Sequence, residues 1–387
     1  MPNLIYVIDL FAGAGGFTSG VHEAGHCVVA CLDHWEKGLA LHYANFPDCV
    51  HLKIRLGGEV EPFVQSLRVL IEALVPSGAT YHVHASPPCQ SFSIAQRQKK
   101  PTKALLDAEA DPRSSLLIWA LEVIRQLDPP RWSLEQVPTA LPFLEKHAPW
   151  IFESDASIRI YPKVYGYEFD APTMRKRLFM GKGWSFDGKT TPFGSKKRFR
   201  CEAEHALGLA QTRPEVAARM LTDAQELGAP ASITLKELAI KTSANKWSSS
   251  KKEREAGRGP NRVVDPTNGE GLRLIDGTPS FAAIASYPLT LFRRIKATPV
   301  RHHRTYLDGT WVKLRALKPS ELAALQGFGR SYRIDELTVV DLRYWDTVAA
   351  FTGSALPHRT TVRLTNADKV RGVGNSVVSS IAACMFA

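Results

Sequence analysis

The sequence has few cysteines and no long apolar run. Six cysteines in 387 residues form no Cys-x-x-Cys pair and show no spacing typical of a zinc site. Since no charged leader precedes "LIYVIDLFAG", we expect free thiols in a cytoplasmic protein, or a nuclear one if the source has a nucleus. No stretch approaches the ~20 apolar residues that span a bilayer. The sequence therefore predicts neither a metal site nor a membrane partner.

Acidic residues are also in deficit, with 38 Asp and Glu against 49 Lys and Arg, which gives a net charge of +11. Residues 182–313 alone hold 23 basic and 13 acidic side chains, an excess of 10. Such a concentrated excess is typical of a surface that contacts a phosphate backbone. A solvated, charge-rich surface is the alternative interpretation.

The first 33 residues predict a β-α-β unit. Residues 4–10 are β-rich, residues 17–25 suit a helix, and residues 27–33 form a second apolar strand. Gly13, Gly15 and Gly16 occupy the first strand-to-helix turn, and Asp33 ends the second strand. In this arrangement backbone amides face a ligand while the acid binds ribose hydroxyls, so the pattern favours a nucleoside-type cofactor over a plain tight turn.

Strands and helices continue to alternate over the first 180 residues. Apolar side chains recur at helical spacing over 60–74 and 116–127, and strands are expected at 81–85 and 131–137. This order predicts an α/β fold with a doubly wound, mainly parallel, Rossmann-like sheet. Asp33, Cys89 and Glu135 then share the rim at the carboxyl ends of the strands, where such sheets bind ligands.

Cys89, in "ASPPCQSFS", could be a structural thiol, a metal ligand or a nucleophile. Glu135 is the nearest acid on the same rim, and Arg175 and Arg177 alternate in a predicted strand, so they point to one face. Peptide hydrolysis would need a Cys and His pair with an oxyanion hole. A thiol, an acid and two guanidinium groups instead suit attack on an electron-poor ring whose nitrogen an acid can protonate.

Six motifs in order resemble those of the DNA cytosine-5 methyltransferases. They are "DLFAGAGGF" (9–17), "PPCQSFS" (87–93), "EQV" (135–137), "RKR" (175–177), "RALKPSELAALQGF" (315–328) and "GNSV" (374–377). The resemblance implies a catalytic and cofactor-binding domain over 1–183 and a smaller target-recognition domain over 184–313. Residues 314–387 would return to complete the methyltransferase sheet.

The resemblance also implies a mechanism on a cytosine flipped out of duplex DNA. Cys89 would attack carbon 6, and Glu135 would share a proton with ring nitrogen 3. Arg177 would hold the cytosine carbonyl, and Arg175 would support the loop or a phosphate.

S-adenosylmethionine is the cofactor that the resemblance implies. Phe11 would lie against the adenine, the turn amides would surround the methionine end, and Asp33 would hold the ribose. The family positions expected to contribute to this pocket are Asp9, Phe11, Ala12, Gly13, Gly15, Gly16, Asp33, His34, Ile54, Pro88, Leu116, Asn375 and Ser376.

Several positions depart from the family pattern. Lys53 stands where an Asp usually faces the adenine amine, and His34 replaces the usual stacking aromatic, unless a shifted register brings in Trp35. Lys cannot accept a hydrogen bond from that amine, so weaker or altered cofactor recognition is expected. Gln136 replaces Asn, which we expect to be tolerated. Thr173 replaces a common Gln, which puts the support of the arginine strand in doubt.

Two other functions remain open. An RNA (tRNA) cytosine-5 methyltransferase would share the Ser-Pro-Pro-Cys-Gln loop, but "AFTGS" (350–354) lacks the Cys of that branch's Cys-Phe-Thr signature. A DNA-binding relative without turnover would fit Lys53 and His34. The expected partner is duplex DNA, with a cognate restriction endonuclease as a candidate, and we expect a monomer from a bacterium or phage.

Overall fold

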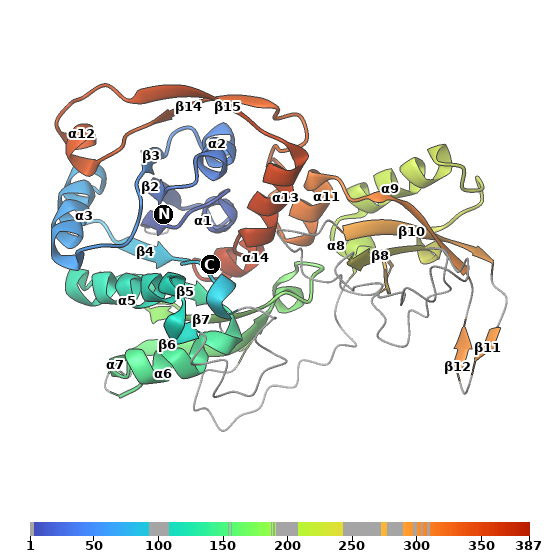
Figure 1. Cartoon of the computed structure of the whole chain (residues 1–387), viewed down its shortest axis with the longest axis horizontal. Helices are drawn as coiled ribbons and strands as arrows, with labels where there is room; N and C mark the ends of the chain where they lie inside the picture. The colour runs from blue at the N-terminus through green and yellow to red at the C-terminus, as the bar shows by residue number, and fades with distance from the viewer. Residues whose placement is uncertain are drawn as a thin grey trace.

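A seven-stranded sheet forms the centre of the computed structural model, in the order β3-β2-β1-β4-β5-β7-β6 (Figure 1). Strands β3, β2, β1, β4 and β5 are parallel, and β7 is antiparallel to both β5 and β6. The expected doubly wound, mainly parallel sheet is confirmed. Its strands are β1 (Tyr6–Leu10), β2 (Cys27–Asp33), β3 (Val50–Lys53), β4 (Tyr81–Ala85), β5 (Arg131–Gln136), β6 (Ile158–Tyr165) and β7 (Lys176–Lys182).

The structure describes residues 4–92, 108–153, 155, 157–186, 188, 190, 208–242, 272–276, 289–296, 300–302, 305–307 and 310–387. Two basic runs within 182–313, "KKRFR" (196–200) and "KKEREAGRGPNR" (251–262), lie outside these residues. Within them, no helix is both long and apolar enough to cross a membrane.

Helices cover both faces of the sheet and bury two apolar cores. One core contains residues of α1, α2, α13 and α14, and the other contains residues of α3, α5, α6 and α7. Helix α3, for example, buries Val64, Leu67 and Leu70 at helical spacing. The bounds are α1 (Gly16–Glu23), α2 (Glu36–Asn45), α3 (Val60–Leu74), α5 (Ser115–Leu127), α6 (Leu141–His147), α7 (Trp150–Glu153), α13 (Asn366–Asn375) and α14 (Ser379–Cys384).

The end of the chain returns to its beginning. Helix α14 packs on α1 so closely that a Cβ added at Gly20 would lie 2.1 Å from the carbonyl oxygen of Ser379. At Gly16 an added Cβ would lie 2.5 Å from the carbonyl oxygen of Val377. Only glycine fits at these two positions. Gly16 of the first motif therefore also allows the last motif to dock, and Gly20 does the same for α14.

A second, smaller sheet lies beside the first, in the order β13-β10-β8-β9 (Figure 1). The division into 1–183, 184–313 and 314–387 stays a prediction, and the two separate sheets support it. The elements here are α8 (Leu209–Thr212), α9 (Pro214–Glu226), β8 (Leu238–Thr242), β9 (Leu272–Leu274), β10 (Leu289–Lys296), β11 (Val300–His302), β12 (Thr305–Leu307), β13 (Thr310–Ala316) and α11 (Pro319–Leu325).

Residues 330–368, which showed little pattern in the sequence, contain an ordered hairpin. Strands β14 (Val339–Tyr344) and β15 (His358–Arg363) pair in antiparallel register, with α12 (Val348–Thr352) between them. The hairpin arches over β3 and α2 (Figure 1). Trp345 donates its amide hydrogen to the carbonyl of His51 (2.9 Å), and Lys53 donates to the carbonyl of Trp345 (2.8 Å). This segment therefore covers the outer edge of the large sheet.

Candidate active site

Cys89 lies half-buried in the loop that follows β4. Ser86, at the start of this loop, donates its amide hydrogen to Leu10 (3.2 Å) and its hydroxyl to the carbonyl of Phe11 (3.3 Å). Phe92 donates its amide hydrogen to the carbonyl of Cys89 itself (3.0 Å), which closes a short 3₁₀ turn (Gln90–Phe92). The start of the Cys89 loop is therefore held next to the end of β1.

Gln136 joins the Cys89 loop to the next strand. Its side-chain nitrogen donates to the carbonyl of Pro87 (3.2 Å), and its side-chain oxygen accepts the amide hydrogen of Val137 (2.9 Å). The hydroxyl of Thr139 donates to the carbonyl of Phe92. Sequence reasoning expected Gln136 only to be tolerated in place of Asn. The buried amide instead ties the Cys89 loop to β5. Because Gln136 directly follows the predicted catalytic residue Glu135, the sequence could have suggested this positioning role.

Glu135, the last residue but one of β5, forms an ion pair with Arg177 of β7, with 2.6 Å between its Oε1 and the arginine Nε. Both side chains are largely buried, with 7% and 12% of their surfaces exposed. A second nitrogen of Arg177 donates to the carbonyl of Lys176 (2.8 Å). Antiparallel pairing of β5 with β7 brings these residues together, so an acid and a guanidinium group share the rim.

Arg175 is buried one residue before β7 begins. Its side chain reaches the C-terminal segment, whereas that of Arg177 reaches Glu135. Nη1 of Arg175 donates to the carbonyl of Gly374 (2.9 Å), at the end of α13. Its amide hydrogen bonds the hydroxyl of Thr173 (3.3 Å), which is also buried. Thr173 therefore supports the arginine segment, a point that the sequence left in doubt. Arg175 joins the returning C-terminal segment to the active-site rim.

The charges of the rim act on one another. The pKa of Arg175 is lowered to about 9, mainly by burial and then by the nearby charge of Arg177, while Glu135 and Cys89 act in the opposite direction. The charges of Cys89, Glu135 and Arg177 thus all act on Arg175, and Glu135 pairs with Arg177. That these four residues form one catalytic site stays a prediction.

The glycine turn after β1 has the backbone geometry that a ligand-binding loop needs. Phe11, Gly13 and Gly15 all have positive φ angles, of 62°, 54° and 85°. A positive φ is costly for Phe11 and indicates a constrained loop. The half-buried Phe11 ring meets the edge of Trp119, with 6.2 Å between ring centroids.

Asp33 braces this turn from the end of β2. One carboxylate oxygen accepts the amide hydrogen of Gly13 (2.9 Å), and the other accepts that of Trp35 (2.8 Å). Burial raises the pKa of Asp33, while these hydrogen bonds lower it. The exposed His34 ring lies 3.5 Å from the same carboxylate. Each oxygen retains a second lone pair with which it could accept from a ribose hydroxyl.

Asp9 is fully buried beneath the turn. The Thr18 hydroxyl donates to its Oδ2 (3.0 Å), and burial raises the pKa of Asp9 to about 8. Any effect of this side chain on a ligand would therefore act through the turn above it.

The other expected pocket residues are distributed along the same edge. Ile54 donates its amide hydrogen to the carbonyl of Asp33 (3.0 Å), and Leu116 lies against Gly57. Ser376 is buried and donates to Gly372 (2.8 Å). Ala12 is buried, Pro88 is half-buried beside Cys89, and Asn375 is exposed at the end of α13.

Lys53, the main departure from the family pattern, is already paired. Its Nζ lies 2.8 Å from Glu36 and 4.3 Å from the centroid of the Tyr344 ring. Burial alone would lower the pKa of Lys53, but Glu36 and Tyr344 raise it above its ordinary value. Tyr344 comes from the β14–β15 hairpin, so this segment contributes to the pocket wall that carries Lys53.

Comparison with known proteins gives a family for the chain. The family model described as C-5 cytosine-specific DNA methylase matches residues 5–357. The Type II methyltransferase M.HgiGI of Herpetosiphon aurantiacus is 33% identical over 91 residues, which cover 24% of this chain and 64% of the relative. M.AquIA of Picosynechococcus is 26% identical over 202 residues, which cover 48% of this chain and 76% of that relative. The first of these alignments thus spans less than two thirds of the relative.

Two solved structures share the fold. An E. coli protein described as a prophage-encoded DNA modification methyltransferase gives a TM-score of 0.50 at 16% identity, covering 99% of this chain and 97% of its own. The S. pombe Dnmt2 methyltransferase also gives 0.50, at 13% identity and with 98% and 96% coverage. Both alignments extend over nearly the whole of each chain.

Proposed function

Because the chain belongs to the C-5 cytosine-specific DNA methylase family, we propose that it transfers a methyl group to carbon 5 of a cytosine in duplex DNA. The observation that carries this proposal is the rim itself. Cys89 and Glu135 act on Arg175 from two neighbouring strand ends, and Glu135 pairs with Arg177. Nothing in this group resembles the Cys and His pair of a thiol hydrolase.

In the proposed reaction the cytosine leaves the duplex stack so that its ring faces become reachable. The Cys89 thiolate forms a bond to carbon 6, and the displaced electron pair moves toward the ring. Glu135 holds a proton at nitrogen 3, which neutralises the negative charge pushed onto the ring. Carbon 5 then accepts a methyl group. Water or a nearby base then takes the proton from carbon 5, the double bond between carbons 5 and 6 forms again, and Cys89 leaves as a thiolate.

The arginines and Gln136 position these groups. Arg177 would donate to the cytosine carbonyl while keeping Glu135 in place. Arg175, anchored on Gly374, would hold the rim to the C-terminal segment. Gln136 would fix the position of the Cys89 loop relative to β5, because its side-chain amide donates to the carbonyl of Pro87.

The residues of the glycine turn fit S-adenosylmethionine, which supplies an electrophilic methyl group when bound. Phe11 offers a half-buried ring, the positive φ angles of Gly13 and Gly15 turn the backbone around a compact ligand, and Asp33 retains lone pairs for ribose hydroxyls. Lys53 does not fit this cofactor, because its ammonium group can only donate hydrogen bonds and the adenine amine is itself a donor.

We further propose that residues 184–313 supply the DNA-reading surface, since nearly all of the excess positive charge lies between 182 and 313. The class name of the relatives, Type II methyltransferase, supports a cytoplasmic role beside a cognate restriction endonuclease. A monomer is the expected assembly.

Transfer of tritium from labelled S-adenosylmethionine tests the proposal. Duplex DNA of mixed sequence should become labelled by the wild type, whereas tRNA should not. Labelling of tRNA alone would favour the RNA branch. DNA binding without any labelling would favour a relative that has lost turnover.

A further inference from the structure

Three buried side chains outside the active site lie close enough together to bind a metal ion. Cys31 of β2 and His51 of β3 are partners in the parallel ladder, so they face the same side of the sheet. Cys49 precedes His51 by two residues and therefore shares that face. Their exposed fractions are 0%, 6% and 1%, and one ligand atom from each lies within 4.8 Å of the other two.

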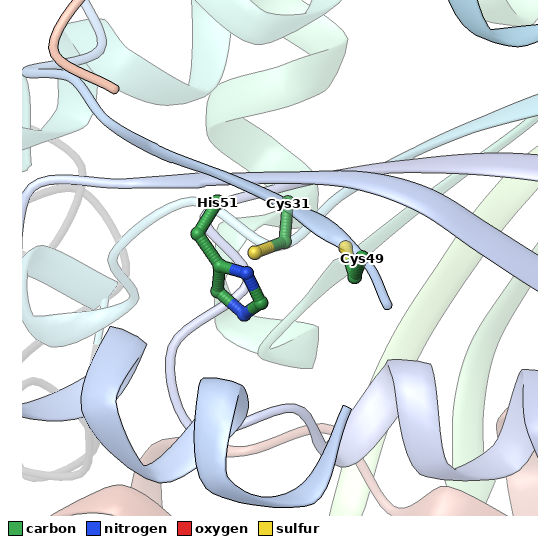
Figure 2. Close-up of side chains that lie close together, drawn as sticks. All are labelled: Cys31, Cys49 and His51. Carbon is green, nitrogen blue, oxygen red and sulfur yellow. The ribbon is translucent and has the colours of Figure 1, made fainter. Parts of the chain in front are cut away.

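The spacing needs little adjustment for a metal ion. With Zn–S of about 2.3 Å and Zn–N of about 2.0 Å, ligand atoms around tetrahedral zinc lie roughly 3.5–3.8 Å apart. The three atoms would have to approach one another by at most about 1.3 Å. Figure 2 shows the Cys31 sulfur pointing toward the imidazole of His51, with Cys49 close by. Cys49 is also 3.6 Å from the carbonyl of Val50, a weak contact that it can give up.

A chain of buried hydrogen bonds orients the histidine. The Thr18 hydroxyl lies 3.0 Å from Asp9 and 2.9 Å from Nε2 of His42. Nδ1 of His42 in turn lies 2.9 Å from Nε2 of His51. Since Nε2 of His51 is engaged in this chain, Nδ1 is the nitrogen that could bind a metal ion, once the ring gives up its hydrogen bond to the backbone of Cys49. Metal-binding histidines characteristically have such a partner on their other nitrogen.

We propose that Cys31, Cys49 and His51 bind one zinc ion, with a water molecule in the fourth position. Two S–H bonds break as two Zn–S bonds form, and two protons are released to solvent. Two thiolates and a neutral imidazole then balance the charge of Zn²⁺, which suits a buried site. The ion would join β2 to β3 two residues before Asp33 and Lys53.

The first experiment measures zinc in the full-length protein after purification in reductant without chelator. We expect about one ion per chain in the wild type, and less than about 0.1 in Cys31→Ser and in His51→Ala. Cys384→Ser, on α14, is the matched control and should keep its zinc. Zinc retained by Cys31→Ser would overturn the proposal.

The second experiment does not depend on the folding of a variant. Wild-type protein stripped of metal and loaded with Co²⁺ should show near-ultraviolet absorption from thiolate-to-metal charge transfer, and added Zn²⁺ should remove it and raise Tm. Absence of both zinc and this absorption in the folded wild type would overturn the proposal. So would a Cys31–Cys49 disulfide, detected as a 2 Da mass loss under non-reducing conditions, in reductant-treated protein.

Discussion

Three of the described cysteines lie in two opposite environments. Cys89 is half-buried on a loop at the carboxyl end of β4, where its charge acts on the guanidinium group of Arg175. Cys31 and Cys49 lie inside the fold, next to the imidazole of His51 and a chain of buried hydrogen bonds. The difference shows that position in the sheet determines what a thiol can do. At the rim it can reach a substrate, and within the sheet it can only pack or bind a metal ion.

The largest expected effect comes from Cys89→Ser. Methyl transfer should fall by about 10⁴-fold or more, because the hydroxyl is a much weaker nucleophile and no second thiol of the described residues lies at the rim. DNA affinity should change by less than about threefold. Tritium transfer and a gel-shift titration measure the two effects. Methyl transfer that persists in Cys89→Ser and is lost in Cys384→Ser would mean that Cys89 is not the nucleophile.

Glu135→Gln should lower the rate of methyl transfer by about 10²–10³-fold, since the amide cannot hold a transferable proton. The variant also removes the ion pair with Arg177. Arg177→Lys keeps the positive charge and loses the Nε contact, so it serves as the matched comparison. Single-turnover rates distinguish the two. An equal, small loss in both variants would mean that Glu135 acts only through the ion pair.

Gln136→Leu tests the contact that holds the Cys89 loop. The apolar side chain has similar size and leaves the carbonyl of Pro87 without its donor, so the loop should shift and the rate should fall by about 10–100-fold. The rate of Gln136→Asn, whose side chain is one methylene shorter, should lie between the rates of the wild type and of Gln136→Leu. Wild-type kinetics in Gln136→Leu at an unchanged Tm would show that the loop is held by other contacts.

Cys31→Ser should affect stability and leave the chemistry of the rim in place. A buried hydroxyl in place of the thiol should cost about 1–3 kcal/mol of unfolding free energy. Denaturant titration gives this value, and methyl transfer measured well below the new Tm should stay within about threefold of the wild type. A loss of activity as large as that of Cys89→Ser would contradict the separation of the two thiol sites.

The smallest effect is expected at Lys53. Lys53→Asp should tighten S-adenosylmethionine binding by about 2–10-fold, because the new side chain can accept from the adenine amine. Lys53→Met removes the charge without adding an acceptor and is the control. Calorimetric titration measures both. Unchanged, micromolar binding in Lys53→Asp would show that Lys53 does not face the adenine.

Much of the scaffold follows from local patterns. Apolar spacing predicts α3 and α5, and the β-α-β opening predicts which strand ends share a rim. The ion pair of Lys53 with Glu36 does not follow, because it depends on rotamers and on Tyr344, which the hairpin brings from nearly 300 residues away. Likewise, Cys31 and His51 meet only through the register of β2 and β3, which spacing along the chain does not reveal.

Covalent trapping tests the central claim most directly. The protein is incubated with S-adenosylmethionine and duplex DNA of mixed sequence containing 5-fluorocytosine, whose carbon 5 cannot lose a proton. We predict a denaturation-resistant protein–DNA band that requires the cofactor and is absent in Cys89→Ser. A wild-type protein that binds this DNA but forms no such band, or a band that persists in Cys89→Ser, would contradict the assignment of Cys89 as the nucleophile.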